Sequence, residues 1–91
     1  MDTDYMRYMD VAEILKVLAH PVRLCIVKNL IDNGECNVCH MHTCLELPQS
    51  TVSQHLQKLR AAGIIEGKRN GLEIYYRVKD ESVIKIINSI L

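Results

Sequence analysis

Residues 47–56, with the sequence LPQSTVSQHL, give the clearest indication of the fold. The Leu-Pro-Gln beginning predicts a tight connection, after which Gln49 or Ser50 opens a helix. Apolar side chains then recur at helical spacing, with Val52 and Leu56 on the same face. Polar side chains crowd the first turn and a half, and Gly63 is a natural residue to end the helix. The stretch therefore predicts a polar-fronted helix that follows a short turn.

The segments before this stretch also show helical spacing. Apolar residues recur at three- and four-residue steps over residues 5–19. Pro21 suits the first turn of a second helix, which an Asp-Asn-Gly sequence at residues 32–34 would end. Asn37 is a good N-cap for a short third helix from residue 38 to about residue 46. We therefore expect three helices ahead of the polar-fronted one.

The apolar pattern changes after Gly63 from a helical period to a period of two. Two strand-like runs, residues 64–69 and 72–78, flank Asn70-Gly71. This dipeptide predicts a β-hairpin with a type I′ turn, in which both central residues have positive φ. Asp80 would then cap a last helix, over residues 80–91. The predicted fold is mainly α with a two-stranded β-hairpin, in the order α-α-α-α-β-β-α.

This order is typical of a winged helix-turn-helix, in which the second helix of the unit enters the major groove of DNA. We expect one domain over residues 1–91, with the helix-turn-helix at residues 38–62 and the wing at residues 64–78. Short polar side chains at the front of a helix can bind phosphates or base edges, and cations at a wing tip can reach the DNA backbone. The candidate DNA-binding residues are Gln49, Ser50, Thr51, Ser53, Gln54, Lys58, Lys68, Arg69 and Asn70.

Composition and charge agree with a small regulator. The chain has 91 residues and a formal net charge of zero. The charge is uneven: residues 1–48 hold four basic and seven acidic residues, whereas residues 49–77 hold five basic and two acidic residues. A core without Trp or Phe is marginal at this length, and pairing into a homodimer would stabilise it. No signal peptide or membrane helix is visible, so we expect a cytoplasmic protein with no membrane partner.

Three motifs together resemble the ArsR/SmtB family of bacterial repressors. They are the stretch at residues 47–56, LAHPVRL at residues 18–24 and GLEIYYR at residues 71–77. The resemblance spans roughly residues 10–90 and is strongest to a Gram-positive branch of the family. It implies a homodimer joined by the first and last helices, residues 5–19 and 80–91, which binds an inverted-repeat operator and represses transcription. It also places four residues on the family's DNA-contact positions: Gln49, Ser50, Ser53 and Gln54.

Residues 35–44, with the sequence ECNVCHMHTC, form the most unusual segment. Three Cys and two His within nine residues suggest a site for zinc, copper(I) or arsenite, since these ions favour thiolate or imidazole ligands. Cys44 falls at a small core-facing position and Cys25 has no neighbouring ligand, so both are interpreted as structural. The candidate metal or redox residues are Cys36, Cys39 and His42.

The resemblance leaves three interpretations of this segment open. The ligand positions of the family's heavy-metal sensors fall here on Asn37, Cys39 and His42, so the first ligand is replaced and Cys36 lies one place away. The family's second metal site, on the last helix, lacks its His because Ser82 stands there. The segment could bind metal or arsenite, act as a thiol redox switch through Cys36 and Cys39, or have no effector role, as in the branch named above. No cofactor is certain.

Two other classes of function compete with a repressor. A thiol oxidoreductase built on Cys36-x-x-Cys39 would need that motif after a strand in an alternating strand-helix pattern, whereas a helix precedes it here. A winged-helix module that only binds proteins would be favoured by an acidic wing or by the loss of Gln49, Ser50 and Ser53, and neither is seen. No Ser/His/Asp set or phosphate-binding Gly loop is present, so we do not expect an enzyme.

Overall fold

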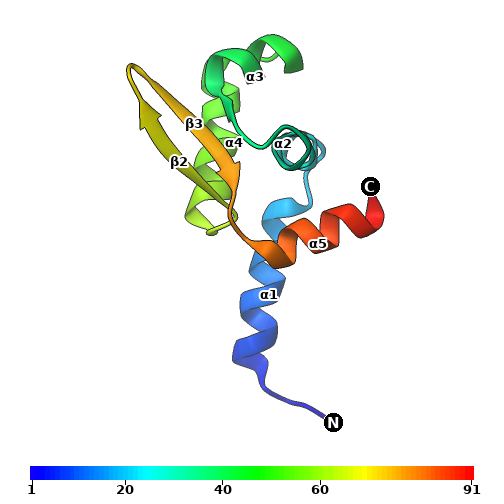
Figure 1. Ribbon diagram of the computed structural model, residues 1–91. Coiled ribbons are helices and arrows are strands. Elements are labelled where there is room, and N and C mark those ends of the chain that lie inside the picture. The colour runs from blue at the N-terminus through cyan, green and yellow to red at the C-terminus, as the bar shows by residue number, and fades with distance from the viewer.

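The computed structural model describes residues 1–91 and contains five helices and three short strands (Figure 1). The order of the long elements is the predicted one, and the mainly α fold with a β-hairpin wing is confirmed. The elements are α1 (Tyr5–Leu18), α2 (Pro21–Asn33), β1 (Cys36–Asn37), α3 (Val38–Leu45), α4 (Gln49–Ala61), β2 (Ile65–Asn70), β3 (Glu73–Val78) and α5 (Glu81–Ile90).

Local side-chain caps explain where four of the five helices begin. Before α1, the Asp4 carboxylate accepts a hydrogen bond from the Arg7 N–H at 3.4 Å. Before α2, the Nδ1 atom of His20 accepts a hydrogen bond from the Val22 N–H, and Pro21 occupies the first turn. Before α3, the Asn37 side chain accepts from the His40 N–H at 2.8 Å. Before α5, the Asp80 carboxylate accepts from two backbone N–H groups. Each cap satisfies a donor that the helix itself cannot pair.

The sheet has one strand more than the sequence predicts. The strand order is β1-β3-β2, and both pairings are antiparallel. Strand β1 is only two residues long, with Cys36 opposite Tyr76 and Asn37 opposite Tyr75. A run of two residues has no periodicity to detect, so only the folded arrangement reveals this strand. It fastens the beginning of α3 to the wing.

The type I′ prediction for the hairpin turn is wrong. Asn70 pairs with Glu73, so Gly71 and Leu72 form the two-residue loop. Of these two, only Gly71 has a positive φ, at 68°. A type I′ turn needs positive φ at both positions, whereas a type II′ turn needs it only at the first, where glycine is favoured. The signs of φ in this loop are therefore those of a type II′ turn.

The core consists of twelve buried side chains, and all of them are apolar. Helix α2 lies among α4, α5 and β3 and contributes three of them, and α4 contributes another three. Burial of one face of α4 fixes this helix in the fold and leaves its opposite face free. The buried residues are Leu18, Ile26, Val27, Leu30, Met41, Val52, Leu56, Leu59, Ile64, Ile65, Val83 and Ile87.

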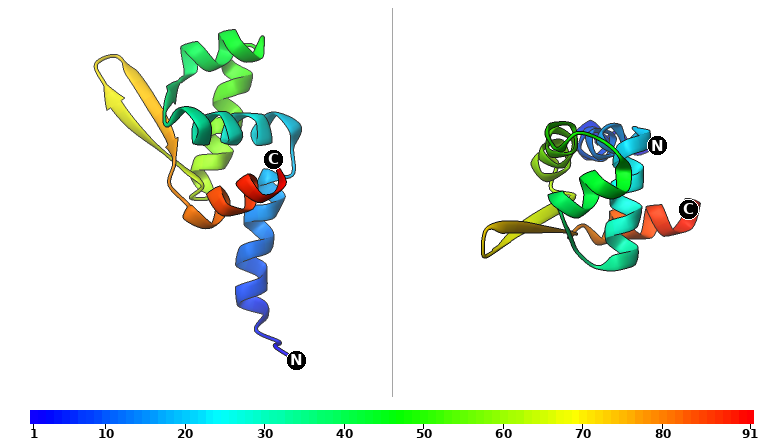
Figure 2. Two further views of the ribbon diagram at one scale, coloured as in Figure 1. Left: turned by 45° about the vertical axis from the view of Figure 1, so that its right-hand side comes forward. Right: turned by 90° about the horizontal axis from the view of Figure 1, so that it is seen from above.

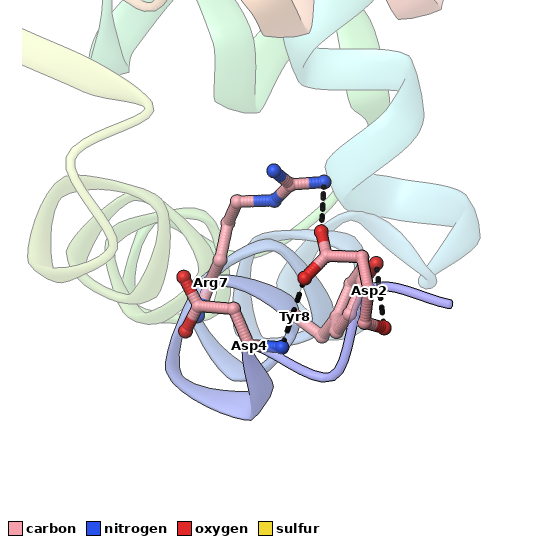
Figure 3. A network of polar contacts seen from close by, with 4 residues as sticks. All are labelled: Asp2, Asp4, Arg7 and Tyr8. Atoms are coloured by element: carbon pink, nitrogen blue, oxygen red, sulfur yellow. Dashed lines mark hydrogen bonds and ion pairs between the residues drawn. The ribbon is translucent and has the colours of Figure 1, made fainter.

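Helix α1 projects from the body of the molecule, and the chain measures 49 × 24 × 21 Å (Figure 2). Its N-terminal end is organised by polar contacts around Asp2, shown in Figure 3. The Asp2 carboxylate pairs with Arg7 at 3.0 Å and accepts from the Asp4 N–H, and the Asp2 carbonyl accepts from the Tyr8 hydroxyl. Only Leu18 of this helix is buried. No helix in the chain combines the length and apolar character that crossing a bilayer requires.

Candidate nucleic-acid interface

A short, well-defined turn sets α4 against α3. The turn spans residues 46–48, and Glu46 adopts left-handed backbone angles with φ of 56°. Two contacts join Leu47 to His42: the Leu47 N–H donates to the His42 carbonyl at 3.3 Å, and the His42 Nδ1 donates to the Leu47 carbonyl at 2.9 Å. These contacts hold the two helices in the relation that a helix-turn-helix requires.

The front of α4 is exposed and has no side-chain cap. The helix begins at Gln49 after Pro48, and no side chain accepts from its first N–H groups. Ser50 therefore does not cap the helix, which separates the two roles that the sequence suggests for it. Gln49, Ser50, Ser53 and Gln54 are exposed, while Thr51 is half-buried. Uncapped N–H groups and the positive end of the helix dipole attract a phosphate.

The wing carries two exposed cations that have no ionic partner. Lys68, Arg69 and Asn70 lie at the end of β2 and are exposed, and neither cation takes part in any ion pair of the chain. Arg77, on β3, differs because it pairs with Glu66 at 2.7 Å. The free cations at the wing tip are therefore available to bind phosphate.

The wing tip and the front of α4 lie at the same end of the molecule, away from the N-terminus (Figure 1). Between them is a groove of about 290 Å³ whose lining includes Ser53 of α4, Cys39 of α3 and Leu72 of the wing tip. The Leu72 side chain is 99% exposed. The sequence pattern placed Leu72 at the start of the second strand, whereas the pairing of Asn70 with Glu73 leaves it in the loop of the hairpin.

Lys58 is the candidate residue that lies apart from this end. It is in the last turn of α4, about 13 Å along the helix from Gln49 at the usual rise per residue. It borders a surface hollow shared with α1 and α2, beside Asp10, Glu13 and Arg23. The structure therefore groups Lys58 with the junction of α1 and α2 rather than with the other candidates.

A cluster around His55 anchors α4 to that junction. Arg23 Nε donates to His55 Nδ1 at 3.2 Å, and the same guanidinium donates to the Val17 carbonyl at 3.0 Å. The rings of His20 and His55 are 4.6 Å apart. Burial lowers the pKa of His55, and the positive charges of His20, Arg23 and Lys58 lower it further. The sequence motifs contained these residues, but spacing alone did not predict that they meet.

The structure does not bring Cys36, Cys39 and His42 together. Cys36 is in β1, Cys39 accepts a hydrogen bond from the Gln49 side chain at 3.4 Å, and the His42 ring is bonded to Leu47. No group of three His, Cys, Asp or Glu side chains is arranged to hold a metal ion. Cys44, which the sequence assigned to packing, is exposed and its sulfur lies 3.4 Å from His40 Nε2.

Comparisons with known proteins show similarity to bacterial transcriptional regulators. Residues 20–67 match the family model described as "Bacterial regulatory protein, arsR family". The chain is 48% identical over 90 residues to the transcriptional repressor PagR of Bacillus anthracis, covering 96% of this chain and 90% of that protein. The crystal structure of PagR superposes with a TM-score of 0.87 at 45% identity, covering 97% of this chain and all of the other.

A second solved structure has a similar fold. It is the homodimeric winged helix-turn-helix DNA-binding domain of a Mycobacterium bovis protein, with a TM-score of 0.86 and 31% identity. The match covers 99% of this chain and 82% of the other. Both solved relatives therefore share nearly the full length of this chain, including the helices outside the region that the family model matches.

Proposed function

The chain belongs to the arsR family of bacterial regulatory proteins, and on that premise we propose that it is a sequence-specific DNA-binding transcriptional repressor. It binds an inverted-repeat operator as a homodimer and acts in the cytoplasm, where the DNA is. In this proposal residues 38–62 form the helix-turn-helix and residues 64–78 the wing of a single domain. Because this family consists of regulators, neither a thiol oxidoreductase nor another enzyme is favoured.

One observation carries the proposal: the uncapped front of α4 and the unpaired cations of the wing lie at one end of the molecule. A helix of this diameter fits the major groove, and the wing is then beside the neighbouring backbone. We assign direct base contacts to Ser53 and Gln54, because their side chains are exposed and form no bond within the chain. We assign phosphate contacts to Ser50, Lys68 and Arg69.

The other candidate residues are assigned no base contact. They are Gln49, Thr51, Lys58 and Asn70. Gln49 is held by Cys39, and Thr51 is half-buried, so each is suited to backbone contacts near the helix front. Asn70 lies beside the two wing cations. Lys58 is distant from the helix front, and we expect it to contribute only to nonspecific attraction.

The exposed apolar surface of α1 supports the homodimer. Tyr5, Met6 and Met9 are 73%, 68% and 60% exposed, and at the other end of the chain Ile90 and Leu91 are 66% and 64% exposed. A monomer that presents this much apolar side chain on one projecting helix and one chain end gains by covering it with a second copy. The homodimeric relative from Mycobacterium bovis supports the same arrangement.

The test begins by selecting operators, since the operator sequence is unknown. Purified protein is used to enrich duplexes from a random pool, and the enriched sequences are expected to contain two half-sites about one helical turn apart with dyad symmetry. Enrichment of no sequence, or of an asymmetric one, would contradict a dimeric repressor. A protein-binding module without DNA function would give that first result.

The base-reading assignment is then tested by fluorescence anisotropy at fixed salt. Ser53→Ala and Gln54→Ala are each expected to weaken binding to the selected operator by about 1–3 kcal/mol while changing binding to random duplex little. Ser82→Ala, at an exposed serine on α5, is the matched control and should leave both affinities unchanged. Equal losses on operator and random duplex would refute the assignment of base contacts.

A further inference from the structure

A polar network outside the residues assigned to DNA contact joins the beginning of α3 to the wing. Asn37 Nδ2 donates to the Glu73 carboxylate at 2.7 Å, and the Tyr75 hydroxyl donates to the same carboxylate oxygen at 3.3 Å. All three side chains are half-buried. Asn37 and Glu73 are 36 residues apart in sequence, so their bond exists only in the folded chain. A hydrogen bond to an ionised carboxylate is stronger than one between neutral groups.

The Asn37 amide is bonded at both of its ends. Its Oδ1 accepts from the His40 N–H at 2.8 Å and caps α3, while its Nδ2 binds Glu73. Since one planar amide makes both contacts, the Glu73 carboxylate has a fixed place relative to the first turn of α3. Helix α3 is in turn bonded to the beginning of α4 through His42 and Leu47. A continuous chain of hydrogen bonds therefore runs from the wing to the helix-turn-helix.

The bond to Glu73 holds the wing closer to its tip than the backbone pairing does. Strand β1 pairs only with Tyr75 and Tyr76 of β3. Glu73 is the first residue of β3, two positions nearer the hairpin loop than Tyr75. An isolated two-stranded hairpin is marginally stable, and its twist varies more than that of a larger sheet. The Asn37–Glu73 bond therefore restrains the part of the wing that the third strand does not reach.

The charge of Glu73 is unfavourable for DNA binding in itself. Glu73 lines the groove between α4 and the wing, together with Ser53 and Leu72. It also pairs across the hairpin with Asn70, which follows the two free cations of β2. A carboxylate in this place repels phosphate and lowers the general attraction to DNA. Attraction to DNA therefore does not account for an acidic side chain here, whereas its bond to Asn37 gives it a structural role.

We propose that Asn37 and Glu73 are positioning residues for operator recognition, a role that rests on the proposed function. Their bond fixes the wing tip relative to α4, so that the wing cations meet phosphates while α4 reads the bases. Without the bond, the tip has to be ordered at the moment of binding, which weakens the complex. The loss falls on the operator, where base contacts fix the position of α4. On random duplex the protein can shift until its cations meet phosphates, so little is lost.

The test compares Glu73→Ala with Glu73→Gln by anisotropy at fixed salt, on the selected operator and on random duplex. Both variants remove the charge, but the glutamine oxygen can still accept from Asn37 Nδ2. The ratio of operator affinity to random-duplex affinity should fall about tenfold in Glu73→Ala, roughly the effect of one mismatched base pair, and stay near the wild-type ratio in Glu73→Gln. The two variants should bind random duplex equally. Equal ratios in the two variants would overturn the proposal, because charge alone would then explain the effect.

Asn37→Ser cuts the same bond from the other side. Serine is also a good N-cap, so α3 keeps its cap while the amide donor to Glu73 is lost. We expect the same tenfold loss in the affinity ratio with a urea midpoint close to that of the wild type. The double variant Asn37→Ser/Glu73→Ala should lose about tenfold in total, whereas two independent effects would multiply to about a hundredfold. A hundredfold loss, or a wild-type ratio in Asn37→Ser, would show that the two residues do not act through their bond.

The order of the wing tip is measured in the free protein, without DNA. Backbone amide order parameters from NMR relaxation at Gly71 and Leu72 should be lower in Glu73→Ala than in Glu73→Gln or the wild type. Equal order in all three proteins would overturn the positioning role of the bond. If the tip loses order but the affinity ratio is unchanged, the inference fails while the repressor assignment stands. If the wild-type protein selects no operator, the repressor assignment fails, and the order parameters still decide whether the bond fixes the wing.

Discussion

Replacement of Lys68 and Arg69 by alanine should make operator binding much less sensitive to salt. Both side chains are exposed at the end of β2 and neither forms an ion pair. A cation in this situation can bind phosphate without first breaking a bond within the protein. Each phosphate contact releases a counterion from the DNA, so the contact appears as salt dependence of the binding constant.

The size of the effect follows from the number of contacts. Two cations on each protomer of a dimer give four phosphate contacts, and each contributes about 0.9 to the slope of log K against log salt, so the double variant should lose about 3.6 from the slope. Between about 50 and 200 mM salt, wild-type protein should then lose about 150-fold more affinity than the variant.

The assay is an anisotropy titration on the selected operator at several salt concentrations. Arg77→Ala is the matched control, because Arg77 carries the same charge on the same hairpin but is bound to Glu66 at 2.7 Å. Its slope should change by less than about 1. A double variant with the wild-type slope, or a larger effect from Arg77→Ala, would refute the assignment of phosphate contacts to the wing tip.

Three further predictions concern stability and assembly. Gly67→Ala should destabilise the fold by about 1–3 kcal/mol in urea unfolding, since the added Cβ would lie 2.8 Å from an Ile74 methyl group; an unchanged midpoint would contradict this. Because the pKa of His55 is lowered in the folded state, stability should be full above pH ~6.5 and fall as the pH drops below it, and His55→Gln should flatten the melting profile; an equal pH dependence in both proteins would exclude His55 as the cause. Met9→Lys, on the exposed face of α1, should give monomers in light scattering, and a persistent dimer would exclude that face.

Much of the fold could be predicted because its signals are local. Pro21 and the caps at Asn37 and Asp80 act within three residues, so the sequence alone indicates where α2, α3 and α5 begin. The hairpin was located correctly, but its turn was shifted by one residue from Asn70-Gly71 to Gly71-Leu72. Register depends on pairing across both strands, and a dipeptide cannot fix it alone.

Part of the candidate DNA interface could also be predicted, because some of its signals are local. The polar residues at the front of α4 are consecutive in sequence, so their shared place follows from the helix itself. The sequence allowed Ser50 either to cap α4 or to bind DNA. In the structure no side chain caps α4, so Ser50 does not have the capping role. The contact between Arg23 and His55 joins residues far apart in the chain, and no spacing rule reaches across that separation.

The sequence by itself determined the helices, the wing and the polar-fronted helix at residues 47–56, since periodicity and capping act over a few residues. Tertiary structure decided what each thiol faces. Cys36 and Cys39 are three apart in sequence, yet β1 and α3 send Cys39 toward Gln49 and leave Cys36 to share a cavity with Cys44. Proximity in sequence limits where a side chain can be, but the packing of α3 against α4 and the sheet decides what it faces.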